Sequence, residues 1–308
     1  MPLYEVYSHP ERCRYKARIF SSSILFLIVV AVLTFLSPIL VAYFTGGFWW
    51  KELNYSEQPR ITYTNKYILS IQNAMGNGAR SFSSSYISLN AAFSSILLYA
   101  NQKSVANDTD SDGIIDQYKI DFIVPLAGAY KIGNIDAWLF FDYELRGRQS
   151  VVMETLALIS LVPPKSVYSN NVTVYGQLVF EQRKPIQSSG VDSSLNTSIL
   201  TYDNGAVPVL NTILDNYFTR NYYTTFQQQY ASWSCNISNS FTLSVVINVK
   251  QQSIRFIPGF WQEFKWGWIQ YLAVLLPFIF LFSRLTEFVF KNQLVKTIIY
   301  STHHRQRA

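Results

Sequence analysis

The chain has 308 residues, of which 49% are hydrophobic and 16% are aromatic, while only 14% are charged. This charge content is low for a soluble globular protein and favours a membrane protein or a β-rich protein that borders a membrane. The formal net charge of +6 comes entirely from the two ends, because residues 45–265 contain 16 basic and 16 acidic residues. The basic balance therefore does not indicate nucleic-acid binding.

The amino-terminal tail, residues 1–18, is followed by 26 residues without a formal charge, from Ile19 to Phe44. This run exceeds the ~20 apolar residues that cross the hydrocarbon core, so we predict a transmembrane helix over 19–44. A cleaved signal peptide is the alternative, but its apolar core is only about 7 to 15 residues long and ends in small residues. Here the run ends in the bulky aromatic sequence AYFTGGFWW.

Residues 45–265 contain several runs in which apolar residues alternate with polar ones, as in strands with one buried face. Turn signals such as NGA and SSG separate the runs, and such a series predicts an antiparallel β-sandwich. The runs are ITYTNKYILSI from Ile61, KIDFIVPL from Lys119, AWLFFDYEL from Ala137, VTVYGQLVFEQ from Val172 and FTLSVVINVKQ from Phe241.

An acidic loop, NDTDSDGIIDQY at residues 107–118, precedes one of these runs. Its spacing matches the first nine positions of an EF-hand calcium loop, where alternating carboxylates and one backbone carbonyl converge on the ion and a glycine permits the bend. Hard oxygen ligands of this kind select Ca²⁺. We therefore predict a metal site formed by Asp108, Asp110, Asp112, the carbonyl of Ile114, and Asp116, with Gly113 at the bend.

The match to an EF-hand is incomplete. Position twelve is Lys119, where an EF-hand has a bidentate glutamate, and a strand pattern rather than a helix follows. The loop thus resembles the DxDxDG calcium loops of extracellular domains, with a structural role and weak affinity, around 10⁻⁴ to 10⁻³ M. The alternative is a solvated acidic turn in which Asp and Asn side chains cap their own backbone.

One stretch of the middle segment follows helical spacing instead. Leu210, Ile213, Leu214 and Tyr217 share one face, and proline is accepted in the first turn of a helix. We therefore predict a single helix from Pro208 to Tyr222.

A second uncharged run of 17 residues extends from Trp266 to Phe282, and we predict a second transmembrane helix over 266–283. The run is at the short end of the range for a span, so the flanking Lys265 and Arg284 are expected to extend toward the interface. The aromatic sequence FWQEFKWGW just before it is typical of an interfacial belt. A buried helix of a soluble protein is the alternative.

Basic residues cluster beside both runs, and basic residues are retained on the cytoplasmic side of a membrane. They are Arg12, Arg14, Lys16 and Arg18 before the first run, and Arg284, Lys291, Lys296, Arg305 and Arg307 after the second. Both tails, 1–18 and 284–308, are thus expected in the cytoplasm and facing anionic lipid, with 45–265 outside or in a lumen. The predicted fold class is an α+β membrane protein: two transmembrane helices flank an antiparallel β-sandwich ectodomain with one helix.

Residues 45–265 also carry five N-glycosylation acceptors, which favour a glycoprotein with this segment outside the cytosol. They are Asn54, Asn107, Asn171, Asn196 and Asn236. Cys13 and Cys235 lie on opposite sides of the predicted first span, so no disulfide forms within the ectodomain. Cys13 is a palmitoylation site or a structural thiol, and Cys235 either pairs with a partner chain or stays a buried thiol.

The usual signatures of catalysis are missing from the middle segment. Its residues include no histidine, because His9, His303 and His304 all lie in the tails. The sequence also lacks a P-loop and a dinucleotide fingerprint, and both predicted spans are uncharged, which disfavours a pore or proton relay within one chain. We therefore predict no enzyme activity, no catalytic residues and no small-molecule substrate.

Three stretches resemble the transmembrane protein 231 family: LYEVYSHPERCRYKARI at the amino terminus, GGFWWKELNYSEQP after the first run, and the sequence from IPGFWQEF to about Val295. The acidic loop lies where that family has a similar acidic pattern. The resemblance implies a two-span protein of the ciliary transition zone, with tectonic and Meckel-syndrome proteins as partners. It also implies a scaffold that contributes to cilium assembly and to the diffusion barrier at the base of the cilium.

Two other functions remain open on the sequence alone. A calcium-dependent extracellular ligand-binding or adhesion receptor would use the same sandwich and loop. An auxiliary subunit of a channel or transporter would also have few spans and no catalytic residues.

Overall fold

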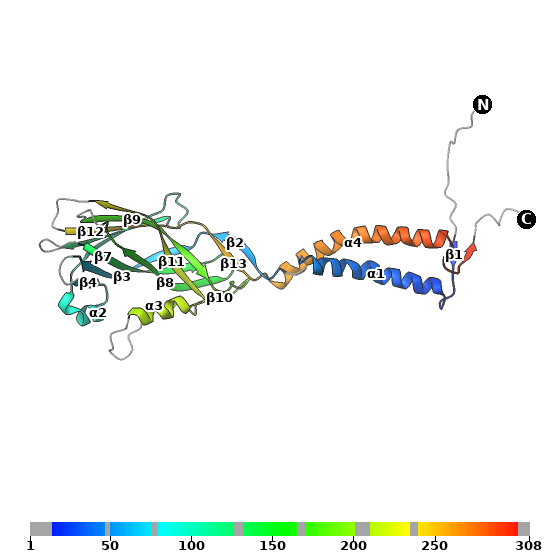
Figure 1. Cartoon of the computed structure of the whole chain (residues 1–308), viewed down its shortest axis with the longest axis horizontal. Coiled ribbons are helices and arrows are strands. Elements are labelled where there is room, and N and C mark those ends of the chain that lie inside the picture. Colours follow the sequence, from blue (N-terminus) through cyan, green and yellow to red (C-terminus); the bar gives the residue numbers. More distant parts are fainter. Residues whose placement is uncertain are drawn as a thin grey trace, which may run out of the picture. The chain divides into compact units, whose positions relative to one another are not determined.

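The computed structural model describes residues 14–46, 50–74, 79–125, 132–164, 170–200, 210–234 and 240–300. The chain forms two compact units, and Figure 1 shows their helices and strands. Met1–Lys51 and Phe260–Ala308 form a helical unit, while Glu52–Gly259 form a β-rich unit.

The helical unit consists of α1 (Ser22–Phe44) and α4 (Phe260–Lys291), both long and apolar enough to cross a membrane. They pack along one narrow stripe that includes two small residues, Ala42 and Gly267, which let the backbones approach. Most other apolar side chains on the two helices are exposed. Because apolar surface of this extent is unfavourable in water, it indicates lipid around both helices.

The second helix is longer than the predicted span of 266–283. It starts at Phe260, so the whole predicted interfacial belt, FWQEFKWGW, is helical. At its other end Glu287 pairs with Arg284 at 3.1 Å and with Lys291 at 2.6 Å. These pairs at spacings of three and four residues stabilise helical turns beyond the apolar run.

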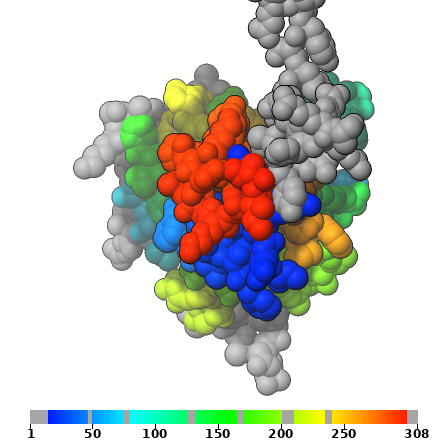
Figure 2. All heavy atoms as spheres, turned by 90° about the vertical axis from the view of Figure 1, so that its right-hand side faces the viewer, coloured from blue at the N-terminus to red at the C-terminus, as the bar shows by residue number. Residues whose placement is uncertain are grey.

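A short sheet joins the two ends of the helical unit. Strand β1 (Arg14–Lys16) pairs antiparallel with β14 (Ile298–Tyr300), and the Ser23 hydroxyl donates to the Lys296 carbonyl at 2.6 Å. Figure 2 shows this end of the unit, where the first described residues in blue lie against the last ones in red. The two tails therefore leave the helices as a connected pair.

The β-rich unit is a sandwich of two five-stranded sheets. The first sheet has the order β10 (Val191–Asp192), β8 (Ser150–Leu161), β7 (Ile132–Leu145), β3 (Arg60–Asn73) and β4 (Arg80–Ser84). The second has the order β11 (Tyr222–Ser234), β9 (Asn171–Gln182), β12 (Ser240–Asn248), β6 (Gln117–Pro125) and β5 (Asn101–Asn107). A two-stranded sheet pairs β13 (Gln252–Phe256) with β2 (Leu53–Glu57).

The sandwich and the two candidate spans confirm the predicted fold class. Most neighbouring strands are antiparallel, as predicted, but β9 with β12 and β8 with β10 are parallel. The first parallel pair arises because β11 and β12, which follow one another in the chain, lie on opposite sides of β9. Alternation within single strands does not contain this information.

The main core fills the space between the sheets. The residues that alternate in the sequence are buried in it, including Ile120, Phe122, Val124, Val172, Val174, Leu178, Leu243, Val245 and Ile247. Only Ile257, Pro258 and Gly259 connect β13 to α4 along the chain.

A second core covers the outer face of the first sheet. Here α2 (Ile87–Ala92), the short 3₁₀-helix at Ser94–Ile96 and α3 (Leu210–Thr219) accompany a cluster around Phe140 and Leu156. The hydroxyl of Tyr217 in α3 accepts hydrogen bonds from the backbone N–H groups of Leu156 at 3.2 Å and Thr224 at 2.9 Å. These bonds join the helix to β8 and β11.

The predicted helix from Pro208 to Tyr222 extends too far at its carboxyl-terminal end. The prediction of a single helix in this unit is also wrong, because α2 is a second one. The described helix α3 ends at Thr219, and Pro208 lies outside the described residues. Tyr222 instead begins β11, where its ring stacks on Phe180 at 5.9 Å between centroids. The residues that share the helical spacing all lie within α3, so the spacing is confirmed, and among the described residues only the last three predicted ones fall outside the helix. The six-residue α2 was not predicted, because so short an element gives no clear periodicity.

Gly176 interrupts the buried face of β9. A Cβ atom there would lie 2.3 Å from Cζ of Phe226 and 2.8 Å from the Gln227 carbonyl oxygen. The Phe226 ring therefore fills the space that a side chain at position 176 would need.

We expect Gly176→Ala to lower the free energy of unfolding by about 1–3 kcal/mol, since the extra methyl overpacks this contact. Chemical denaturation of the purified full chain measures the change. Thr225→Ala, a neighbouring change on β11, should stay within about 0.5 kcal/mol of the parent. Phe226→Leu in the Gly176→Ala background should recover part of the loss. Equal stability of parent and Gly176→Ala would show that the contact is not tight.

Candidate metal centre

The acidic loop closes the hairpin between β5 and β6. Asn107 and Gln117 are registered partners at its base. The Asp116 N–H donates to the Asn107 carbonyl at 3.0 Å, and the Val249 N–H donates to the Asp116 carbonyl at 2.7 Å. The base of the loop is thus held by its own hairpin and by the chain that leaves β12.

Two residues give the loop its sharp bend. Gly113 has φ +84°, in the left-handed region that glycine enters without steric cost, and Ser111 has φ +62°. The glycine therefore occupies the position for which the calcium-loop pattern requires it.

The carboxylates accept hydrogen bonds from the loop backbone. Asp108 accepts from the N–H of Ser111 at 2.7 Å and of Gly113 at 3.0 Å. Asp112 accepts from the N–H of Ile114 at 2.7 Å. These bonds are those of the solvated acidic turn, and they order the loop with or without an ion.

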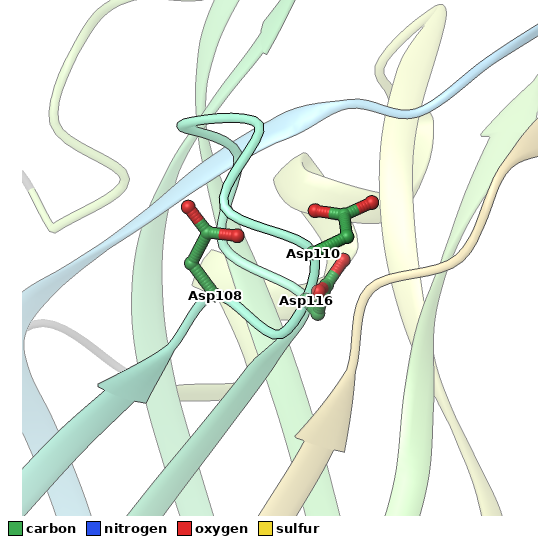
Figure 3. A group of neighbouring side chains, drawn as sticks. All are labelled: Asp108, Asp110 and Asp116. Carbon is green, nitrogen blue, oxygen red and sulfur yellow. The ribbon is translucent and has the colours of Figure 1, made fainter.

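Three of the predicted ligands also converge. Asp108, Asp110 and Asp116 each offer a carboxylate oxygen, and these oxygens lie within 4.8 Å of one another. Figure 3 shows the three side chains in the loop. Two oxygens that bind one Ca²⁺ at 2.3–2.6 Å can be at most about 5 Å apart, so this spacing fits calcium. Asp112 is not in the group, and no described contact tests the Ile114 carbonyl. Calcium binding remains a prediction.

The arrangement of the loop raises the pKa of Asp110 and lowers the pKa of Asp116. The Asp112 N–H donates to Asp110 and lowers its pKa, but desolvation and the charges of Asp112, Asp116 and Asp108 outweigh this bond and raise the pKa above its ordinary value. The pKa of Asp116 is lowered by hydrogen bonds from the Thr109 N–H and the Gln58 side chain. A bound cation would relieve the repulsion at Asp110.

Gln58 was not identified from the sequence. Its Nε2 donates to Oδ1 of Asp116 at 2.9 Å from the connection between β2 and β3. Gln58 and Asp116 are 58 residues apart, and no local sequence pattern relates them, so the contact is evident only from the folded structure.

The predicted glycosylation sites lie in different surroundings. Asn54 on β2, Asn107 at the base of the acidic loop, and Asn196 are exposed, while Asn171 at the start of β9 is half-buried. Asn236, Cys13 and Cys235 lie outside the described residues.

Comparison with known proteins gives one consistent family. Residues 1–299 match the family model described as Transmembrane protein 231. Transmembrane protein 231 of Xenopus tropicalis is 32% identical over 306 residues, covering 97% of this chain and 96% of that protein. The Homo sapiens protein of the same name is 30% identical over 309 residues, covering 97% and 95%. None of these names describes an enzyme.

A solved structure titled "Cryo-EM structure of a proton-activated chloride channel" covers 87% of this chain and 97% of its own. Its sequence identity is 6% and the TM-score is 0.29. A score of this size supports no structural argument.

We expect Asp110→Asn to remove a calcium-dependent gain in stability. In 10 mM calcium the parent should melt a few degrees higher than in chelator, because an ion that binds only the folded state stabilises it. The variant should show no such gain, yet in chelator it should be at least as stable as the parent, since a repelling charge is gone. Asp215→Asn, an exposed change on α3, is the matched control. The same melting temperature of the parent in calcium and in chelator would show that the loop is a solvated turn that does not bind calcium.

Asp116 gives a pH-dependent prediction. Its folded-state pKa is lowered, so its stabilising effect is complete above the unfolded-state pKa of about 3.9 and disappears as the pH falls through the folded-state pKa. In chelator, Asp116→Asn should therefore unfold more easily than the parent at pH 5–7, and the difference should shrink toward pH 3. Denaturant titrations at several pH values measure it. A difference that persists unchanged to pH 3 would contradict the proposed hydrogen bonds.

Proposed function

Because the chain belongs to the transmembrane protein 231 family, we propose that it is a non-enzymatic scaffold in the membrane of the ciliary transition zone. In this role it contributes to cilium assembly and to the diffusion barrier at the base of the cilium. The single observation that carries the proposal is the family match over residues 1–299. It confirms the resemblance that three stretches of the sequence already indicated.

Attachment to the membrane is supported by the surface of the helical unit. Side chains such as Leu25, Phe35, Ile279 and Phe280 are exposed on helices that could each cross a bilayer. Lipid is the environment in which this surface is stable. Two crossings return the chain to its starting side, so both tails share one compartment, and the basic residues beside the helices favour the cytoplasm.

The paired tails offer a site for cytoplasmic partners. Strands β1 and β14 bring residues from the two ends of the sequence into one small sheet, and the tails carry an excess of basic residues. A partner that binds this sheet would contact both ends of the chain at once. Meckel-syndrome proteins of the cytoplasm are the proposed partners here.

The sandwich is the proposed binding surface for tectonic proteins and other ectodomains. It has two well-filled cores, and the carboxylate group of the acidic loop is the only cluster of potential metal ligands found among the described residues. A folded sandwich of this kind can serve as a scaffold through its faces and edges. Weak calcium binding would stabilise one of its loops.

Localisation tests the proposal. The full chain with a carboxyl-terminal tag, expressed at its natural level in ciliated cells, should form a ring between the basal body and the axoneme. Loss of the protein should let membrane proteins of the cell body enter the cilium, as measured by fluorescence recovery across the ciliary base. A single-span protein of the plasma membrane with the same tag is the control. Uniform plasma-membrane staining would contradict the scaffold and favour a receptor instead.

A further inference from the structure

No helix among the described residues packs across the outer face of the second sheet. Figure 1 shows α2 and α3 on the opposite side of the sandwich, next to the first sheet. The outward side chains of β11, β9, β12, β6 and β5 follow from alternation, because their neighbours in each strand point into the core. Strand register then shows which of them lie side by side.

One row on this face consists entirely of side-chain amides. It crosses all five strands in register and comprises Asn107, Gln117, Asn248, Gln177 and Gln227. Within the row, Gln117 Nε2 donates to Asn248 Oδ1 at 2.9 Å, and Gln177 Nε2 donates to Gln227 Oε1 at 2.7 Å. Each amide has two donor hydrogens and a carbonyl oxygen, so capacity for further hydrogen bonds remains.

The adjacent row supplies exposed aromatic rings. It comprises Val105, Lys119, Val246, Tyr175 and Tyr230, again in register across the five strands. Tyr175 and Tyr230 are direct partners on β9 and β11, and they are 42% and 63% exposed. Two adjacent tyrosines thus stand beside the amide row without a described element over them.

A cavity of about 240 Å³ adjoins the amide row at Gln177. It opens where the chain leaves β12, and polar residues of the following segment line it, including Lys250, Gln251 and Ser253. Its wall is fixed, because the amide of Gln252 donates to the Leu178 carbonyl at 2.7 Å and accepts from the Phe180 N–H at 2.7 Å. The cavity has room for one sugar ring.

We propose that this face binds a neutral oligosaccharide. Sugar hydroxyls both donate and accept hydrogen bonds, which matches a row of amides, and the apolar C–H face of a sugar ring packs on a tyrosine. The charge also fits: Lys119 lies 4.0 Å from Asp121, so the centre of the face carries little net charge. The core of a protein interface is predominantly apolar, whereas one full row across this face consists of amides.

In the bound state, one sugar ring occupies the cavity beside Gln177 and the next rings lie along the two tyrosines. The chain would thus recognise glycans of neighbouring glycoproteins or glycolipids, which goes beyond a scaffold that binds proteins. The site shares Asn107 and Gln117 with the base of the acidic loop but includes none of its aspartates, and it is expected to act without calcium.

An array of neutral oligosaccharides tests the proposal, with oligomannose, N-acetyllactosamine and β-glucan probes beside sialylated and sulfated ones. The full chain is used in lipid nanodiscs, which avoids detergents with sugar headgroups, and it is produced in a host without N-glycosylation, which leaves Asn107 as an amide. At least one neutral probe should bind with a Kd below about 1 mM. Tyr175→Ala with Tyr230→Ala, and separately Gln177→Ala, should weaken that binding at least tenfold.

Two controls make the result specific. Tyr99→Ala removes a tyrosine that is 78% exposed elsewhere on the sandwich and should leave binding unchanged. Tyr175→Phe with Tyr230→Phe keeps the rings and should retain binding. Thermal unfolding of each variant identifies any that are misfolded. Absence of binding to every neutral probe, binding only to anionic probes, or binding that survives the double alanine change would each overturn the proposal.

Discussion

The structure depends on a lipid environment for the apolar side chains that α1 and α4 expose. α1 and α4 pack against one another along one stripe and expose apolar side chains elsewhere. In water this arrangement would be costly, at roughly 25 cal/mol for each Å² of apolar surface. In lipid the same surface has no such cost, and small residues such as Ala42 and Gly267 are buried where the helices pack. The ends of the sandwich sequence are therefore both attached to membrane-embedded helices.

The sandwich has no disulfide between its described residues, so its stability depends on buried side chains. These form two hydrophobic cores rather than one. The space between the sheets is filled by alternating aliphatic and aromatic side chains, and the outer face of the first sheet is covered by short helices. The second sheet is left with a polar outer face. The outer face of the first sheet is thus buried in a core, whereas the outer face of the second sheet is available for the proposed recognition.

Sequence patterns predicted the parts of this fold that are set locally. Long apolar runs predicted the helices, and alternation correctly predicted the buried faces of strands such as β6 and β12. The same reasoning failed where distant segments decide the outcome. Tyr222 joins a strand because Phe180 and the core receive its ring, and the pairing of β1 with β14 joins opposite ends of the chain.

The acidic loop shows the same division. The spacing of its aspartates and the need for Gly113 at the bend were evident in the sequence, and three of the predicted ligands do lie together. The contact from Gln58 was not, because it depends on the fold, whereas the hydrogen bond that Asp112 accepts from the Ile114 N–H matches the alternative of a solvated turn. Likewise, the amide row on the second sheet exists only once the register of five strands is known.

Cysteine accessibility in intact cells tests the central arrangement most directly. In a chain whose two native cysteines are replaced by serine, one reporter is placed in the sandwich as Ser193→Cys and another after α4 as Leu294→Cys. An impermeant maleimide should label the first in intact cells and the second only after the membrane is permeabilised. Labelling in the reverse order, or of both reporters in intact cells, would contradict a sandwich held outside the cytosol by two spans.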